Sequence, residues 1–379
     1  MDEKIIPGGL TDPISSSLVF DQVIKWALDN DADELFLTEN WVPTIEIRKR
    51  KYPISLRKTH KGELISLLDS IYGPSASSQL GTDVPVDRRY EYRVGRSKPI
   101  GFRLNATTGL CNGKSVRITL RKIPSVIPSV DSLGLSSSLV EYINELDQGA
   151  VWFVGGTGQG KSTSMAAILA HRLAQEGRFE NLITVESPIE FTYDNVEIAD
   201  SIYFQMAVGD NADAKTFSSG VEDCLRKKPT IIQVGEARDL PTIEAAILAA
   251  MTGHLVFTTA HANDTSTAIR RLVSVFPDES RQSMMVDLFD NSRCFIAQRL
   301  YPRADGEGLV AVRERFDITD RIADILMDSD PRKIGKSAQS ALFEYGTPMV
   351  RDAERLHSEG VLSDQTLSKI RANYKGLSL

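Results

Sequence analysis

The stretch VWFVGGTGQGKS, residues 151–162, decides the fold of this chain. Its first four residues, Val151 to Val154, are apolar and predict a buried strand. The pattern GxxxxGKS follows from Gly155 to Ser162, and a helical pattern then continues to Ala174. A glycine-rich loop between a buried strand and a helix is typical of a P-loop, which binds the phosphates of a nucleotide.

Each residue type in this loop has a physical role. Glycines let backbone N–H groups turn toward phosphate oxygens, and the start of the helix adds a partial positive charge. Lys161, which we expect to be an exposed loop cation, would contact the β and γ phosphates of ATP, and Ser162 would ligate Mg²⁺. The predicted nucleotide-binding residues of the loop are Gly155, Gly156, Thr157, Gly158, Gln159, Gly160, Lys161, Ser162 and Thr163.

Two glutamates follow other apolar runs. Glu186 closes the run from Leu182 to Val185, and Glu236 comes shortly after the run from Ile231 to Val234. Because ligands of open α/β sheets bind outside the carboxyl ends of the strands, we expect both side chains near the phosphates. Either could activate the attacking water or hold a water of the Mg²⁺ shell. A solvated loop acid is the alternative for each.

Two of the five histidines, His254 and His261, flank the apolar run from Leu255 to Thr259. With one at each end of a strand, they are candidates for sensing the γ-phosphate. A hydrogen-bonded structural histidine is the alternative for both. The His and Cys spacings do not fit a zinc site.

Composition narrows the classes of protein. The chain has 379 residues, 44 Lys and Arg against 51 Asp and Glu, and a net charge of −7, so direct nucleic-acid binding is not expected. Cys111, Cys224 and Cys294 are far apart and predict reduced core residues. No run reaches the ~18 apolar residues of a membrane span, so we expect a cytoplasmic chain that meets membrane only through partners.

The residues before the P-loop predict a separate α+β domain. Its expected helices and strands are Phe20–Ala27, Leu35–Leu37, Thr44–Ile47, Lys61–Ile71, Tyr90–Val94, Phe102–Leu104 and Ser115–Arg121. In the last strand, Arg117 and Arg121 share one face, which predicts a basic outer face. Pro124, Pro128 and Gly134 then predict a linker.

Beyond the linker, apolar runs joined by helical stretches predict a parallel sheet and an α/β domain. Short amphipathic helices are expected near the C-terminus at Asp320–Leu326, Met349–His357 and Thr366–Tyr374.

Several stretches together resemble the secretion and pilus traffic ATPases, the superfamily of type II secretion and type IV pilus motors, within its twitching-retraction branch. VESPIEF from Val185 resembles the Asp box of that family, VGEARD from Val234 its atypical Walker B box, and TGHLVFTTAHA from Thr252 its His box. Shorter similarities are LRKKP at 225–229, RRLVSVFP at 270–277, GFRLN at 101–105 and RKIPS at 121–125. The resemblance covers about residues 19 to 376.

The resemblance implies a PAS-like α+β N-terminal domain, a linker and a RecA-like P-loop domain with a parallel sheet and C-terminal helices. The implied segments are a tail at 1–18, the PAS-like domain at 19–123, the linker at 124–138, the RecA-like core at 139–318 and a helical segment at 319–379. It also implies a homohexameric ring that works with inner-membrane components of a secretion or transfer machine.

The resemblance further assigns roles to residues of the site. It implies that Glu236 activates water, that Glu186 is a second acid at the metal beside Ser162, and that His254, with His261 as a second candidate, senses nucleotide. Arginines of a neighbouring subunit would complete each site, and the candidates are Arg103, Arg121 and Arg226. Exposed arginines without a catalytic role are the alternative.

Two positions depart from the family pattern. Ser187 stands where the Asp box usually has aspartate, and Glu222 stands where the retraction branch commonly has arginine. These departures favour the type IVB secretion and plasmid-transfer members, of the DotB and TraJ kind, over a pilus retraction ATPase. A P-loop small-molecule kinase and a RecA-like DNA motor are less favoured alternatives.

Overall fold

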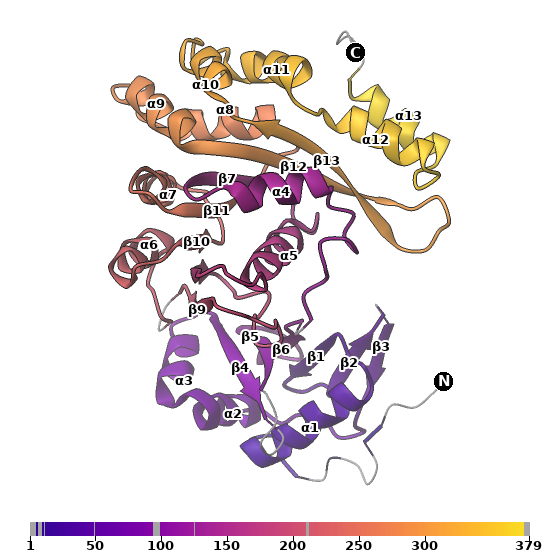
Figure 1. Cartoon of the computed structure of the whole chain (residues 1–379). Helices are drawn as coiled ribbons and strands as arrows, with labels where there is room; N and C mark the ends of the chain where they lie inside the picture. The colour runs from indigo at the N-terminus through magenta and orange to yellow at the C-terminus, as the bar shows by residue number, and fades with distance from the viewer. Residues whose placement is uncertain are drawn as a thin grey trace. The chain divides into compact units, whose positions relative to one another are not determined.

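The computed structural model describes residues 5–6, 10, 12–48, 50–93, 99–124, 126–209 and 212–374 (Figure 1). The chain divides into two units, Met1–Ser125 and Val126–Leu379. Each unit has its own sheet and its own hydrophobic core.

The first unit is built on a six-stranded antiparallel sheet with strand order β3-β2-β1-β6-β5-β4. The strands are β1 (Glu34–Thr38), β2 (Thr44–Ile47), β3 (Arg50–Pro53), β4 (Val86–Tyr92), β5 (Ile100–Leu110) and β6 (Lys114–Lys122). The helices are α1 (Ser17–Asp29), α2 (Glu63–Tyr72) and α3 (Pro74–Gly81). In β6, Ile118 and Leu120 enter the core while Arg117 and Arg121 point outward, so the α+β prediction is confirmed.

Pro74 occupies the first position of α3, where its missing N–H costs nothing. One local expectation differs from the structure in this unit. Cys111 is only half-buried in the turn after β5, whereas Cys224 and Cys294 are buried core residues as predicted. The expected strand end at Val94 lies outside the described residues.

The second unit contains a seven-stranded sheet with strand order β13-β12-β7-β11-β10-β8-β9. The strands are β7 (Gly149–Val154), β8 (Asn181–Glu186), β9 (Ile202–Ala207), β10 (Ile231–Val234), β11 (Leu255–Ala260), β12 (Ser292–Pro302) and β13 (Leu309–Asp317). Neighbouring strands are parallel except for the β12–β13 pair. The predicted α/β domain with a parallel sheet is therefore confirmed.

Helices cover both faces of this sheet. They are α4 (Ser137–Glu145), α5 (Lys161–Leu173), α6 (Phe217–Cys224), the 3₁₀ turn η1 (Leu225–Lys227), α7 (Leu240–Met251), α8 (Thr265–Val275), α9 (Arg281–Asn291), α10 (Asp320–Met327), α11 (Ile334–Tyr345), α12 (Met349–Ser358) and α13 (Asp364–Ala372). Trp152 faces the core formed with α6 to α13, and Phe153 faces the core formed with α4 and α5. Strands buried on both faces explain the continuous apolar runs in the sequence.

The later part of the predicted linker packs on the second unit. Val130 and Leu135 are buried in the same core as α4 and α5. The C-terminal helices also join this unit, because Leu326, Val350 and Ile370 belong to its other core. None of the helices in the described ranges combines the length and the apolar character that a membrane span requires.

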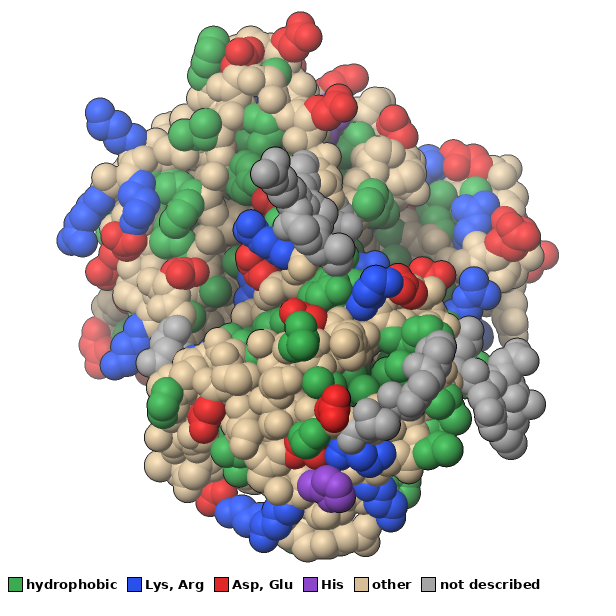
Figure 2. Space-filling model, turned by 90° about the horizontal axis from the view of Figure 1, so that it is seen from below, with side chains coloured by type: hydrophobic (Ala, Val, Ile, Leu, Met, Phe, Trp, Pro, Cys, Tyr) green, Lys and Arg blue, Asp and Glu red, His purple; other side chains and the backbone are tan. Residues whose placement is uncertain are grey.

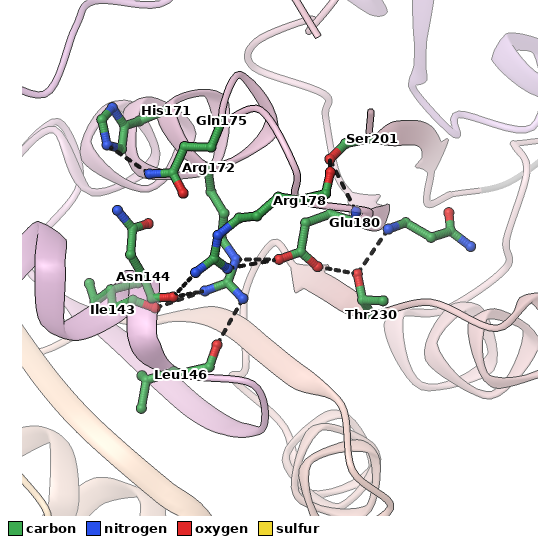
Figure 3. Close-up of polar contacts among 11 residues, drawn as sticks. Ile143, Asn144, Leu146, His171, Arg172, Gln175, Arg178, Glu180, Ser201 and Thr230 are labelled. Atoms are coloured by element: carbon green, nitrogen blue, oxygen red, sulfur yellow. Dashed lines mark hydrogen bonds and ion pairs between the residues drawn. The ribbon is translucent and has the colours of Figure 1, made fainter. Parts of the chain in front are cut away.

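A buried ionic network fixes the amino edge of the second sheet (Figure 3). Arg172, in the last turn of α5, donates from Nε to Oε1 of Glu180 at 2.7 Å. Its two other nitrogens donate to the carbonyl oxygens of Ile143 and Leu146 at the end of α4, both at 2.8 Å. Glu180 also accepts a hydrogen bond from Thr230 Oγ1 at 2.5 Å. The network therefore ties the end of α5 to α4 and to the starts of β8 and β10.

Both ionised groups of this network are buried. Burial lowers the pKa of Arg172, and Glu180 partly offsets that effect. Burial would raise the pKa of Glu180, but hydrogen bonds from Thr230 and Arg172 outweigh it and hold the pKa below its ordinary value. Removing one partner of a buried pair leaves an uncompensated charge and typically costs about 3–5 kcal/mol. The interactions at the amino edge are therefore costly to break.

Candidate active site

A pocket of about 420 Å³ lies at the carboxyl ends of the parallel strands in the second unit. Its lining combines the P-loop with residues that follow β8, β10 and β11, as the rule for open α/β sheets predicts. The lining residues are Thr157, Gly158, Gln159, Gly160, Lys161, Ser162, Thr163, Met165, Glu186, Ser187, Pro188, Glu190, Phe217, Gln233, Gly235, Glu236, Thr259, His261 and Leu300.

The P-loop backbone needs glycine for two different reasons. Gly160, which precedes α5, has a φ of +76°, a left-handed conformation that costs glycine little. Gly155 instead needs the absence of a side chain, because a Cβ atom there would lie 2.8 Å from the carbonyl oxygen of Gln298. The loop therefore fits closely against β12.

Lys161 corrects one expectation. It is the first residue of α5 and is only 7% exposed, so it is not an exposed loop cation. Its Nζ donates to the carbonyl oxygens of Gly155 at 2.8 Å and Gly156 at 3.0 Å. Burial lowers the pKa of Lys161, while Glu236 and Glu190 oppose this shift. The loop curls around its own lysine, which the residue pattern alone did not reveal.

Glu236 and His261 meet in this pocket. His261 Nε2 lies 3.4 Å from Oε1 of Glu236, and Nη1 of Arg238 lies 3.9 Å from Oε2. Burial and the nearby Lys161 lower the pKa of His261, although Glu236 acts in the opposite direction. The imidazole is therefore mainly neutral at pH 7, which leaves Glu236 beside a neutral hydrogen-bonding group.

Glu186 ends β8 and is 6% exposed. Its Oε1 accepts hydrogen bonds from Thr184 Oγ1 at 2.6 Å and Gln205 Nε2 at 3.2 Å. Burial raises the pKa of Glu186 to about 7 against these two bonds, and the neighbouring Glu190 raises it further. A bound cation would favour the ionised form, since opposite charge stabilises a carboxylate.

The residues present fit Mg²⁺. Ser162 and Glu186 line the same pocket with a hydroxyl and a carboxylate, the hard oxygen donors that Mg²⁺ takes. Among the residues that the structure describes, no group of three His, Cys, Asp or Glu side chains is arranged to hold a metal. Mg²⁺ in nucleotide sites needs only one or two protein ligands beside phosphates and waters.

His254 does not reach this pocket, which corrects its predicted role within its own chain. It precedes β11 at the amino end, and its Nδ1 lies 3.0 Å from the carbonyl oxygen of Ala249 and 3.2 Å from Thr252 Oγ1. The strand between His254 and the pocket spans about 20 Å at ~3.3 Å per residue. The two histidines lie at opposite ends of β11, so His261 lines the pocket and His254 lies away from it.

The three candidate arginines lie outside the described lining of the pocket. Arg103 and Arg121 are cross-strand neighbours on β5 and β6 in the first unit. Their guanidinium groups bond to carboxylates of the same sheet, Arg103 to Asp87 at 2.8 Å and Arg121 to Glu34 at 2.7 Å. The predicted basic face is thus partly neutralised. On the side of the molecule drawn in Figure 2, acidic and basic side chains are interspersed.

Arg226 belongs to the second unit. It is exposed in η1, which directly precedes the loop leading into the amino end of β10. That position is at the opposite edge of the sheet from the P-loop. A role of Arg226 in catalysis would therefore have to be exerted on the pocket of another subunit.

Sequence reasoning missed several lining residues. Gln233 and Thr259 lie inside runs that were interpreted only as buried strands, and both are buried with hydrogen-bond partners, Tyr193 and the carbonyl oxygen of Gly235. A polar residue within a buried apolar run was the available signal, because it needs a partner or a ligand. Phe217 and Leu300 offered no comparable signal.

Parallel strands that bring a P-loop and two acids to one pocket are the arrangement of the RecA-like P-loop ATPases, and the second unit is of this class. Residues 11–324 match the family described as Type II/IV secretion system protein. This match covers most of the chain, so the chain belongs to that family of traffic ATPases and is an ATP-hydrolysing enzyme. The resemblance recognised in the sequence boxes is thereby confirmed.

Individual relatives agree with this assignment. The type IV pilus ATPase PilU of Pseudomonas aeruginosa is 28% identical over 321 residues, which are 83% of this chain and 78% of the relative. The crystal structure of the ATPase DotB of Legionella pneumophila is 33% identical, with a TM-score of 0.88 over 95% of this chain and 97% of that one. The pilus retraction motor PilT with bound ADP has 28% identity and a TM-score of 0.77, covering 92% and 96%.

Proposed function

We propose that this chain is a hexameric motor ATPase that powers a bacterial type IVB secretion or conjugative transfer machine at the inner membrane. The observation that carries the proposal is the likeness of the whole chain to Legionella DotB, with a TM-score of 0.88 against 0.77 for PilT. The higher identity, 33% against 28%, supports the same choice. The ring would lie in the cytoplasm and reach the membrane through partner proteins.

In the proposed reaction, the P-loop N–H groups and Lys161 bind the β and γ phosphates of ATP. Lys161 would exchange its bonds to Gly155 and Gly156 for phosphate oxygens, which are stronger acceptors because they are charged. Ser162 and Glu186 would hold Mg²⁺, which supplies charge neutralisation at the phosphates. The ADP bound in the PilT structure supports nucleotide binding by this chain.

Glu236 is the proposed base. It is part-exposed in the pocket, so its carboxylate can reach a water molecule, whereas Glu186 is buried and held by Thr184 and Gln205. The carboxylate would accept a hydrogen bond from the attacking water and orient it in line with the γ-phosphate. His261, mainly neutral beside it, is a candidate for sensing whether the γ-phosphate is present.

A pilus retraction ATPase is the second candidate. The 28% identity to PilU over 83% of this chain and the likeness to PilT favour it. A strain of the source organism that carries Lys161→Gln as its only copy separates the two. Loss of plasmid or protein transfer with normal twitching supports the transfer machine, and loss of twitching with normal transfer supports pilus retraction.

The biochemical part of the proposal has a direct test. The purified chain should release inorganic phosphate from MgATP without any added acceptor, and sedimentation should show a species of six subunits. A requirement for a small-molecule acceptor would instead indicate a kinase. Strong stimulation by single-stranded DNA would indicate a DNA motor. A monomer under all nucleotide conditions would contradict the hexameric ring.

A further inference from the structure

A buried glutamine of β12 contacts the P-loop from outside it. Gln298 is 2% exposed, and its Nε2 donates to the carbonyl oxygen of Gln159 at 2.7 Å. The neighbouring backbone makes a second bond to the same residue, from the N–H of Leu300 to Oε1 of Gln159 at 2.7 Å. The fit is close, since a Cβ atom at Gly160 would lie 2.9 Å from Nε2 of Gln298. A displacement of the P-loop therefore acts directly on Gln298.

The other end of this amide is held by an arginine. Gln298 Oε1 accepts hydrogen bonds from Ser164 Oγ at 2.8 Å and from Arg313 Nε at 2.9 Å. An amide oxygen and an amide nitrogen are fixed to one another by the planar group. One planar amide group therefore connects Gln159 to Arg313 of β13.

Arg313 continues the chain of contacts to the segment that joins the two units. Its Nη1 donates to the carbonyl oxygen of Gly134, and its Nη2 to that of Leu133, each at 2.9 Å. These residues form a turn closed by bonds from Gly134 N to the carbonyl of Asp131 and from Leu135 N to that of Val130. The guanidinium group thus makes four hydrogen bonds, one to Gln298, two to this turn and one to Ser164 Oγ at 3.5 Å.

Stability alone is a poor reason for this arrangement. The hydrogen bonds of the Arg313 side chain go to uncharged acceptors, namely an amide, two carbonyls and a hydroxyl. Burial lowers the pKa of Arg313 to about 10, with Asp352 opposing the shift. Replacing buried charged groups by apolar residues of similar volume is often neutral or stabilising. A buried cation at this position therefore calls for a role beyond packing.

We infer that Gln298 and Arg313 are positioning residues that couple the P-loop to the turn at Leu133 and Gly134, so that nucleotide binding changes the segment leading to the first unit. The inference rests on nucleotide binding by the P-loop, not on which machine the ATPase drives. A two-unit motor needs such a connection, because hinge movement must follow the state of the nucleotide.

Hydrogen exchange with and without ATPγS tests the coupling in the full-length chain. In the wild type, saturating ATPγS should slow exchange in peptides covering 155–163 and also change exchange in peptides covering 126–140. In Arg313→Met, which keeps the side-chain length but removes all donors, the response at 155–163 should remain. The response at 126–140 should fall at least fivefold. Arg313→Lys, with one donor group, should recover part of it.

The matched control is Arg315→Met on the same strand, because the guanidinium group of Arg315 bonds to Asp317 and lies over the ring of Tyr142 in α4, outside the 126–140 segment. It should respond like the wild type. If Arg313→Met fails to fold, Gln298→Met takes its place, because it breaks the connection at the P-loop end. It should show the same loss of the exchange response at 126–140. An unchanged response at 126–140 in these variants overturns the coupling. Absence of protection at 155–163 in the wild type overturns the nucleotide site itself and the coupling with it.

Discussion

His261 Nε2 lies 3.4 Å from Oε1 of Glu236, so the ends of β10 and β11 place a mainly neutral imidazole beside the proposed catalytic carboxylate. Glu236 and His261 thus belong to one site although α7 and β11 lie between them in the chain. The parallel pairing of the two strands brings their ends to the same edge.

Glu236→Gln tests the base. The substitution keeps the shape and the hydrogen bonding of the side chain but removes its charge, so we expect nucleotide affinity within about twofold of wild type and hydrolysis lower by about 100-fold. Phosphate release and fluorescent-nucleotide binding measure the two effects. Glu186→Gln is the comparison, and it should weaken both binding and turnover. Loss of binding in Glu236→Gln would mean that Glu236 mainly holds the metal.

The pH dependence of turnover tests the neighbouring imidazole. Because the pKa of His261 is lowered from its ordinary value of 6.5, the group stays neutral at pH 7 and gains its proton only in more acidic solution. The protonated imidazole would then pair with Glu236 and make the carboxylate of Glu236 a weaker base. We expect kcat to fall with pH below the pKa of His261, and this acid limb to be absent in His261→Gln. Identical pH profiles would exclude His261 as its cause.

Lys161→Gln should behave differently from a change at an exposed loop. The side chain is buried and donates to two carbonyls, so its loss should cost about 1–2 kcal/mol of stability besides the affinity for ATP. Thermal unfolding should show a small decrease without nucleotide. ATP should raise the unfolding temperature of the wild type but not that of Lys161→Gln. Turnover at the wild-type rate would contradict the P-loop assignment.

Mixed rings test whether Arg121 acts on another subunit. Arg121→Ala and Lys161→Gln, each inactive alone, should regain ATPase activity when mixed, since some interfaces then combine an intact arginine with an intact P-loop. Arg117→Ala is the matched control, because Arg117 lies on the same face of β6 but donates to Thr38. It should be active alone. If labelled subunits show mixed rings without activity, the trans role fails, and the same test applies to Arg103 and Arg226.

Acid sensitivity should reveal the ionic network at the amino edge. The pKa of Glu180 is lower in the folded chain than its ordinary value of 4.5, so its contribution to stability is complete above that value and is lost as pH falls through the folded pKa. Glu180→Gln should destabilise the second unit by about 3–5 kcal/mol at pH 7. The difference from wild type should shrink below about pH 4.5. Urea unfolding at pH 7 and pH 4 measures the free energy of unfolding. The control is Asp305→Asn at an exposed position, which should change that free energy little at either pH.

Buried parallel strands could be predicted well from the sequence because both of their faces are apolar. The run Ile231 to Val234 coincides with β10, and the P-loop context before α5 was equally plain. The β12–β13 hairpin could not be predicted in this way, because Gln298, Arg313 and Glu314 interrupt its apolar pattern. These polar side chains are buried only because distant segments supply their partners.

Part of the candidate site could also be predicted from the positions of the buried parallel strands. Residues that directly follow strands, Glu186, Glu236 and His261, reach one pocket because parallel strands share a carboxyl edge. His254 was misplaced because its position relative to the direction of the strand was not used. The burial of Lys161 depends on how the loop folds back on itself, and the residue types alone do not determine that.

The position of β12 beside β7 has a consequence for biosynthesis. Leu300 forms part of the pocket wall, and Gln298 holds the P-loop, yet both emerge from the ribosome well over a hundred residues after Lys161. Until they arrive, the strand that carries the P-loop has an open neighbouring position in the sheet. We therefore expect a nascent chain to acquire its nucleotide pocket late in translation, which delays futile ATP consumption by unfinished subunits.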